Sequence, residues 1–215
     1  MGALLFMLII YTVPISLYCA KLRIVLRHKE LKWEEQPPIG GYGSDEYKTI
    51  IPSGNLPALI DGKLLIADSE AIAEYLEEIC PTPAMLPAKP DTRAKTREAG
   101  RFHDTRLEPE LRKLFKTLSS KNQDQKLQES QETEINTRLH QFSKLLNPEP
   151  NRLFLGDCGY PISFSWLDAL IPLLSLRINW PTEIKTWRKK IEQFPAVKDE
   201  LADYKPKLEK WMNNL

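Results

Sequence analysis

The side chains with the clearest chemical potential in this chain stand at the starts of predicted helices. Ser16 precedes one segment of helical periodicity, and Asp68 with Ser69 precedes another. The first N–H groups of a helix have no partner within it, so a helix N-terminus favours negative charge. A hydroxyl group there can donate a hydrogen bond to a sulfur anion, and an acidic-hydroxyl pair can help to hold a carboxylate. These positions favour binding of a small peptide that carries a thiol.

A third stretch adds a backbone contact. Asn55, Leu56 and Pro57 precede a short apolar run that ends at Asp61-Gly62. Proline lacks a backbone N–H and commonly begins a strand, and the backbone beside it is an edge to which an extended peptide can pair. Simpler interpretations remain open at this point, in which Pro57 only starts a strand and Ser16 and Asp68 only cap helices.

Composition restricts the class of protein. The chain has 215 residues, 42% hydrophobic and 27% charged, as expected of a soluble globular protein of one large or two small domains. Lys and Arg number 30 and Asp and Glu number 29, which argues against a dominant nucleic-acid footprint. The histidines and cysteines have no metal-ligand spacing, so no metal site is expected.

Location follows from the same reasoning. Three cysteines without paired spacing (Cys19, Cys80 and Cys158) fit a reducing compartment and a cytoplasmic protein. The apolar run from Ala3 to Ile10 lacks the basic leading region of a signal peptide and is too short to span a bilayer. We interpret it as a buried strand and expect no membrane association.

The elements that position these residues form two halves. Before the prolines, strands are expected at 5–11, 32–36, 58–60 and 63–66, with helices after Ser16, near Ser44 and after Asp68, in the order β-α-β-α-β-β-α. Prolines at 81, 83, 87 and 90 mark a linker. The half that follows looks entirely helical. Its first element is a long helix that Asp91 is expected to cap and that runs to about Ser119, with Pro109 bending or interrupting it.

The later helices show the same periodicity. They are expected at 125–146, from Ser165 to about Leu176, from Thr182 and from about Val197. Ser165 and Asp168 resemble a capping box at the start of a helix that is apolar nearly all round. Their role is predicted to be structural.

Four marks in this order resemble the cytosolic glutathione S-transferase family, of the serine type found in theta-, phi- and zeta-like members. They are Ser16 followed by Lys21-Leu22-Arg23, the run Gly54–Leu59, the run Asp68–Ile72, and Ser165–Asp168. The resemblance implies an α/β plus all-α fold: a thioredoxin-like domain at 1–82, a proline-rich linker at 83–90 and an all-helical domain at 91–215. It also implies a homodimer.

The resemblance also implies roles for the marked residues. Ser16 is expected to donate a hydrogen bond to the thiolate of glutathione, the cosubstrate. The Leu56–Pro57 bond should be cis and leave the Leu56 backbone free to pair with the cysteinyl part of glutathione. Asp68 and Ser69 should hold the γ-glutamyl end, where Asp replaces the commoner Glu or Gln and reaches less far. Asn55 is a candidate contact for the γ-glutamyl or glycyl part.

The second substrate would be a small hydrophobic electrophile. Phe102, His103 and Arg106 are candidates for its pocket, although the sequence does not fix which helix face they occupy. Cys19 is interpreted as a small packed residue, with mixed disulfide formation left open. The absence of a cysteine at position 16 argues against glutaredoxin-type disulfide exchange.

The expected activity is that of a detoxifying transferase, which conjugates glutathione to an electrophile. Two alternatives stay open on the same fold. One is a glutathione-dependent isomerase or reductive dehalogenase, and the other is a non-catalytic binding module. The Ser-Ser-Cys run of the maleylacetoacetate isomerase branch is missing, because Leu17 and Tyr18 follow Ser16.

Overall fold

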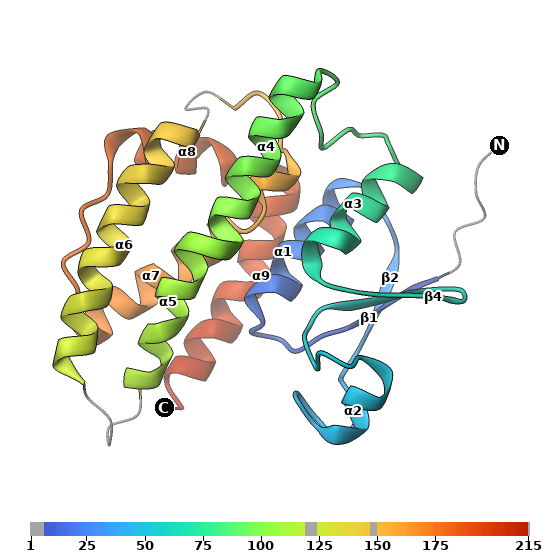
Figure 1. Ribbon diagram of the computed structural model, residues 1–215, viewed down its shortest axis with the longest axis horizontal. Helices are drawn as coiled ribbons and strands as arrows, with labels where there is room; N and C mark the ends of the chain where they lie inside the picture. The colour runs from blue at the N-terminus through green and yellow to red at the C-terminus, as the bar shows by residue number, and fades with distance from the viewer. Residues whose placement is uncertain (1–6, 119–123, 147–149, 215) are drawn as a thin grey trace. The chain divides into compact units, whose positions relative to one another are not determined.

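The polypeptide divides after Met85 into two units, residues 1–85 and 86–215, and this boundary falls inside the predicted linker at 83–90. The computed structural model describes residues 7–118, 124–146 and 150–214 (Figure 1). The first residues of the strand predicted from Leu5, and the predicted end of the long helix at Ser119, lie outside these ranges.

Over its described residues, 7–85, the first unit is a four-stranded mixed sheet with three helices. Its elements are β1 (Leu8–Tyr11), α1 (Leu17–His28), β2 (Trp33–Gln36), α2 (Asp45–Ile50), β3 (Ala58–Asp61), β4 (Leu64–Ala67) and α3 (Ser69–Ile79). The strand order is β2-β1-β3-β4, with β1 parallel to β2 and antiparallel to β3. Helices α1 and α3 cover one face of the sheet, and α2 lies beyond the other (Figure 1). The predicted order β-α-β-α-β-β-α is confirmed.

The hairpin between β3 and β4 differs from the prediction by one residue. Asp61 pairs with Leu64, so the two-residue turn is Gly62-Lys63 and not Asp61-Gly62. Gly62 has φ +58°. A glycine with positive φ at the first turn position is the pattern of a tight hairpin turn that matches the strand twist.

A buried ion pair fixes the residues after α3. The Nζ of Lys29 on α1 lies 2.6 Å from Oε2 of Glu77 on α3, and it also donates to the carbonyl oxygens of Cys80 and Pro83. The same carboxylate accepts from the Met85 N–H at 3.0 Å and 3.1 Å. Both charged groups are buried, and each also bonds to the backbone of residues 80–85. These bonds hold the segment after α3 in a single conformation.

The second unit is helical throughout the parts that the structure describes. Its elements are α4 (Pro90–Phe102), the π-helical turn η1 (His103–Leu107), α5 (Glu108–Lys113), the 3₁₀ turn η2 (Leu114–Thr117), α6 (Gln125–Leu145), the 3₁₀ turn η3 (Leu155–Asp157), α7 (Tyr160–Leu174), α8 (Thr182–Ile191) and α9 (Pro195–Met212).

Pro109 interrupts the long helix as expected, through a π-helical turn. Proline has no N–H to donate to the carbonyl of Thr105, and its ring crowds that carbonyl. The helix widens over His103–Leu107, where the Glu108 N–H bonds to the carbonyl of His103 instead. The predicted cap at Asp91 is wrong, since α4 begins with Pro90 and Lys89 stands at the cap position without a side-chain bond.

Helix α7 begins earlier than predicted. It starts at Tyr160 with Pro161 in its first turn, and proline is favoured there because its φ suits the helix. Ser165 is therefore an interior residue whose Oγ donates to the Pro161 carbonyl at 2.9 Å. Asp168 forms an ion pair with Arg188 on α8. The capping-box interpretation of Ser165 and Asp168 is wrong, while their structural role stands.

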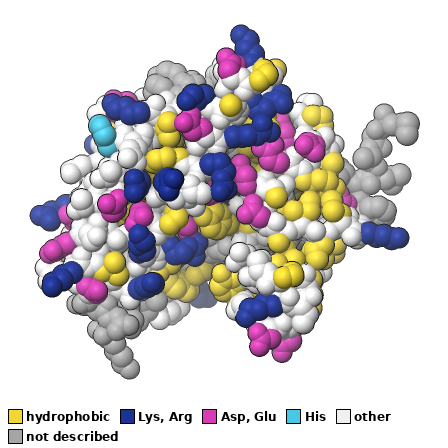
Figure 2. All heavy atoms as spheres, viewed as in Figure 1, with side chains coloured by type: hydrophobic (Ala, Val, Ile, Leu, Met, Phe, Trp, Pro, Cys, Tyr) yellow, Lys and Arg dark blue, Asp and Glu magenta, His cyan; other side chains and the backbone are white. Residues whose placement is uncertain are grey.

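Aromatic rings make the core of this unit, and charges of both signs cover it. Phe142 stacks on Tyr160 with ring centroids 3.8 Å apart, and Trp187 meets both rings edge-on. Figure 2 shows Lys and Arg side chains interspersed with Asp and Glu over the face in view, without a one-sign field. Within the described ranges, no helix combines the length and hydropathy needed to cross a bilayer.

Candidate functional site

Strand register brings the three predicted site segments to one edge of the sheet. Tyr11 at the end of β1 pairs with Ala58 at the start of β3, and Ala58 pairs with Ala67 at the end of β4. These residues form one row across the sheet. The loop that leads to Ser16 follows Tyr11. Leu56-Pro57 come directly before Ala58, and Asp68-Ser69 come directly after Ala67. Segments as far apart in the sequence as Ser16 and Ser69 therefore leave the sheet together.

Ser16 is the N-cap of α1. Its Oγ accepts a hydrogen bond from the Cys19 N–H at 3.3 Å, and its backbone is extended. The cap uses a lone pair of the hydroxyl oxygen and leaves the hydroxyl hydrogen available to donate. Capping the helix and donating to an anion are therefore compatible, and the helix end adds a favourable field for negative charge.

The Leu56–Pro57 peptide bond is cis, as the family resemblance implies. Leu56 is buried, and its backbone N–H and C=O make no hydrogen bond to another residue of the described ranges. Asn55 beside it is exposed, with its carbonyl oxygen accepting from the hydroxyl of Tyr47 at 3.1 Å. The backbone at Leu56 thus has the donor and acceptor that an added peptide strand needs.

Asp68 caps α3 from an unusual backbone conformation. Its φ is +93°, a region that residues other than glycine rarely adopt. Its Oδ1 accepts from the N–H groups of Glu70 and Ala71 at 2.9 Å and 3.1 Å. Ser69 follows as the first helical residue and is largely buried. Strained residues of this kind cluster at ligand sites, where the surrounding structure holds them.

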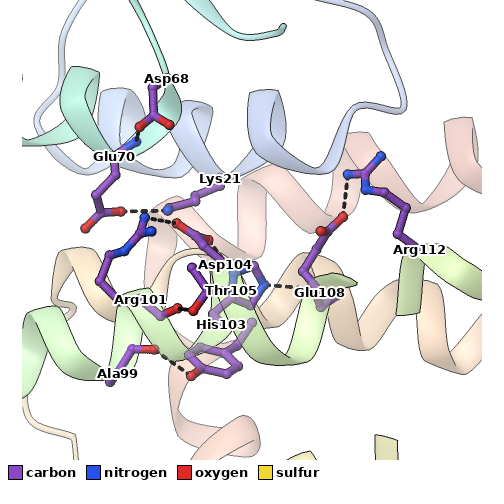
Figure 3. Close-up of polar contacts among 12 residues, drawn as sticks. Lys21, Asp68, Glu70, Ala99, Arg101, His103, Asp104, Thr105, Glu108 and Arg112 are labelled. Atoms are coloured by element: carbon purple, nitrogen blue, oxygen red, sulfur yellow. Dashed lines mark hydrogen bonds and ion pairs between the residues drawn. The ribbon is translucent and has the colours of Figure 1, made fainter. Parts of the chain in front are cut away.

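Two further residues connect the Ser16 helix with the Asp68 helix. Lys21 on α1 donates from Nζ to Oε2 of Glu70 on α3 at 2.7 Å (Figure 3). Lys21 is 2% exposed, so this ion pair is largely shielded from water. The sequence identified Lys21 and Glu70 only as members of two separate motifs and gave neither a role. Nothing in the local pattern shows that residues 49 positions apart will pair.

Cys19 is enclosed beneath Ser16. It is 0% exposed, and its Sγ lies 4.0 Å from the Tyr11 carbonyl oxygen. Burial raises the pKa of the Cys19 thiol, an effect that hydrogen bonds from Ser16 and Thr12 partly oppose. A buried neutral thiol is a poor nucleophile. This burial agrees with the interpretation of Cys19 as a packed residue and disfavours mixed disulfide formation.

The three candidate pocket residues differ in exposure. Phe102 at the end of α4 is half-buried, and Arg106 in η1 is exposed. His103 is 1% exposed, and its Nδ1 lies 2.7 Å from Oδ1 of Asp104, which Figure 3 shows beside it. Its Nε2 lies 2.8 Å from Oγ of Ser163. Because both ring nitrogens are engaged, His103 acts within the second unit as a connection between η1 and α7. Phe102 and Arg106 stay predictions as pocket residues.

Comparison with known proteins shows what each part of the chain is similar to. Residues 10–84 match the family model described as "Glutathione S-transferase, N-terminal domain". This match lies within the first unit of the chain. The whole fold also agrees with that of a tau-class glutathione S-transferase from mango, Mangifera indica. That structure superposes with a TM-score of 0.80 at 20% identity, over 97% of this chain and 98% of the mango chain.

Curated relatives are similar to this chain over shorter stretches. A probable maleylacetoacetate isomerase 1 of Drosophila melanogaster is 33% identical over 144 residues, 64% of this chain and 57% of the relative. A stringent starvation protein A homolog of Pasteurella multocida is 35% identical over 82 residues, 38% of this chain and 39% of the relative. The chain therefore spans about half the length of the curated relatives that it matches, or less.

Proposed function

We propose that this protein binds glutathione in its first unit and transfers the sulfur to a small hydrophobic electrophile. The observation that carries the proposal is the row Tyr11–Ala58–Ala67, which places the Ser16, Leu56-Pro57 and Asp68-Ser69 segments at one edge of the sheet. Each segment supplies a different group: a hydroxyl donor, a backbone pairing edge and a helix N-terminus.

The binding mode follows from these groups. The cysteinyl part of glutathione pairs with the N–H and C=O of Leu56, and its γ-glutamyl carboxylate takes the Ser69 hydroxyl and the first N–H groups of α3. Asp68 lies near the γ-glutamyl amine, and Asn55 is exposed beside the same backbone. The thiol then lies towards the N-terminus of α1.

Chemistry at that position requires a thiolate. The Ser16 hydroxyl donates to the sulfur anion, and the α1 N-terminus adds to its stabilisation. Lowering a thiol pKa from about 8.5 to below 7 takes roughly 2–3 kcal/mol of preferential anion stabilisation, which one charge-assisted hydrogen bond and a helix end can supply. The proton leaves to solvent, and the sulfur forms a bond to the electrophilic carbon. In a substitution the leaving group departs with its bonding electron pair. In an addition the π electron pair moves to the neighbouring atom, which takes up a proton from solvent.

The test is the ionisation of bound glutathione. The ultraviolet absorbance of the thiolate, titrated on the complex, gives the sulfur pKa for the native chain and for Ser16→Ala. We expect a pKa below 7 in the native complex and a value near that of free glutathione, about 8.5, in the variant. Equal values in the two proteins would overturn the role of Ser16.

Ser44→Ala is the matched control. Ser44 caps α2 by accepting from the Tyr47 N–H at 3.0 Å, so the variant loses the same type of cap away from the proposed site. We expect Ser44→Ala to lose stability and to leave the pKa of the bound thiol unchanged. A comparable shift in both variants would assign the Ser16 effect to helix capping.

A glutathione-dependent isomerase is the second candidate. The observation in its favour is the 33% identity to the Drosophila maleylacetoacetate isomerase over 64% of this chain. Parallel assays of maleylacetoacetate isomerisation and of conjugation to an aryl halide separate the two activities. Glutathione binding without either activity would favour a non-catalytic module.

We also propose a cytoplasmic homodimer with a detoxifying role. Cys19, Cys80 and Cys158 are free thiols, which suits a reducing compartment. Leu64 and Leu65 on the edge strand β4 are each 41% exposed, and apolar side chains on a sheet edge favour association. Light scattering of the purified chain gives its mass directly, and a monomer at micromolar concentration would contradict the dimer.

A further inference from the structure

We propose a second binding site, inside the helical unit, for a small aromatic or aliphatic primary amine. The site is a hollow between the first turns of α4, the end of α6 and the turn η3. It shares no residue with the proposed glutathione site, and the inference goes beyond the proposed function. Three observations support it: the size of the hollow, the chemistry of its lining and the rigidity of its frame.

The hollow has the size and the lining of a ligand pocket. It encloses about 340 Å³, within the range of small-molecule sites. Apolar side chains make most of its wall, and they come from three separate elements. They include Ala99 from α4, Phe142 and Leu145 from α6, and Phe154 from the segment before η3. Such a lining favours a ligand with a compact hydrocarbon body.

Asp157 supplies the polar anchor. Its Oδ2 accepts from the Phe154 N–H at 2.9 Å, while its own N–H donates to the Phe154 carbonyl at 3.0 Å. Its other carboxylate oxygen has no hydrogen-bond partner among the described residues, and the side chain lines the hollow. Burial raises the pKa of Asp157 to about 7, with the Phe154 N–H opposing the shift. A ligand ammonium would supply both a donor and a compensating charge.

The other charged groups near the hollow do not compete for this role. Lys95 from α4 also lines it, but its Nζ pairs with Glu98 at 2.6 Å and its side chain is 76% exposed. Tyr160 on α7 faces Asp157 as a neutral phenol, because burial raises its pKa well above the ordinary value. Asp157 is therefore the lining group able to select the charge of a ligand.

The frame is rigid because η3 packs directly on α4. A Cβ on Gly156 would lie 2.2 Å from the carbonyl oxygen of Thr96, so only glycine permits this approach. The Phe142 ring is held by its stacking on Tyr160. A preformed wall lowers the ordering cost of binding.

The experiment uses three probes of one shape and different charge: benzylamine, benzyl alcohol and benzoate. Calorimetry or ligand-observed NMR on the full chain, without glutathione, gives each affinity at pH 8. We expect benzylamine to bind at least tenfold more tightly than benzyl alcohol, and benzoate to bind least. Raising the pH from 6 to 8 should strengthen benzylamine binding as Asp157 ionises.

Variants distinguish the contribution of the Asp157 charge to binding from that of the shape of the hollow. Asp157→Asn should remove the preference for the amine, while Asp199→Asn, an exposed aspartate of the same unit, should keep it. Ala99→Leu and Leu145→Phe each reduce the hollow and should weaken both benzylamine and benzyl alcohol. Unfolding curves confirm that each variant is folded. Equal affinity for amine and alcohol, unchanged binding in Asp157→Asn, or no saturable binding would overturn the proposal.

Discussion

Lys21 and Glu70 join the two helices that begin at the proposed glutathione site. The 2.7 Å bond from Nζ to Oε2 connects the second turn of α1, which Ser16 caps, with the first turn of α3, which Asp68 caps. Lys21 is almost fully buried, so the pair acts in a medium of low effective dielectric. It holds Ser16, the proposed hydroxyl donor, and the start of α3, the proposed carboxylate site, in a fixed relationship.

Removal of one partner should therefore affect both stability and glutathione binding. We expect Glu70→Gln to lower the free energy of unfolding by about 1–3 kcal/mol, because the buried ammonium of Lys21 loses its carboxylate. The double variant Lys21→Met with Glu70→Gln should recover part of this loss. Urea titration measures the stability, and the KM for glutathione should rise in Glu70→Gln.

Asp45→Asn is the control for this pair. Asp45 forms an ion pair with Lys48 at 3.2 Å on the surface, with its own side chain 99% exposed. Exposed pairs of this type contribute at most about 1 kcal/mol, so this variant should leave stability and KM nearly unchanged. A loss in Glu70→Gln no larger than in Asp45→Asn would contradict the proposed positioning role.

Asp157 should give stability a distinctive pH dependence. Its carboxyl takes up a proton on folding, because its pKa rises from 3.8 to about 7. The folded state binds more protons than the unfolded state between these values, so stability should fall as the pH rises from about 4 to 7. We expect Asp157→Asn to be more stable than the native chain at pH 8 by about 1–2 kcal/mol, after discounting for partial exposure.

The extra stability of the variant should diminish as the pH falls and disappear below about pH 3, where the carboxyl is neutral in both the folded and the unfolded state. Thermal or urea unfolding at several pH values measures it. A constant difference across this range would show that Asp157 does not titrate on folding.

Because α7 begins at Tyr160, Ser165 should contribute less to stability than a residue that caps a helix. Asp124 caps α6 by accepting from the Leu127 N–H at 3.0 Å, so Asp124→Ala should lower stability by about 1 kcal/mol. Ser165 lies inside α7, and its hydroxyl donates to the carbonyl of Pro161, one turn earlier in the same helix. Because this bond satisfies no unpaired N–H at a helix start, Ser165→Ala should change stability by less than about 0.5 kcal/mol. The reverse ranking would restore Ser165 as a cap.

Gly156 should tolerate no side chain. In Gly156→Ala the new Cβ would meet a backbone oxygen of α4 at 2.2 Å, and backbone atoms of a packed helix cannot move aside easily. We expect a loss of about 2–3 kcal/mol or more, measured by urea unfolding. Ala94→Gly, at an exposed position of α4, serves as the control and should lose about 1 kcal/mol from helix propensity alone. A native-like Gly156→Ala would contradict the close packing of η3 on α4.

Local signals in the sequence determined the order of elements and most of their starts. Periodicity and caps are short-range properties, so Ser16, Ser44 and Asp68 could be recognised as helix starts from a few neighbouring residues. The start of α7 could not be found in this way. That helix is apolar nearly all round, so its periodicity does not mark where it begins.

Only the tertiary structure decided which residues meet. Strand register aligned Tyr11, Ala58 and Ala67, helix packing paired Lys21 with Glu70, and the fold enclosed His103 against Ser163. These contacts join positions far apart in the chain, and their geometry depends on the packing of whole elements. The amino-acid sequence determined which chemical groups stand at the ends of the elements, whereas the three-dimensional packing determined their partners, because distance in space is not a local property of the chain.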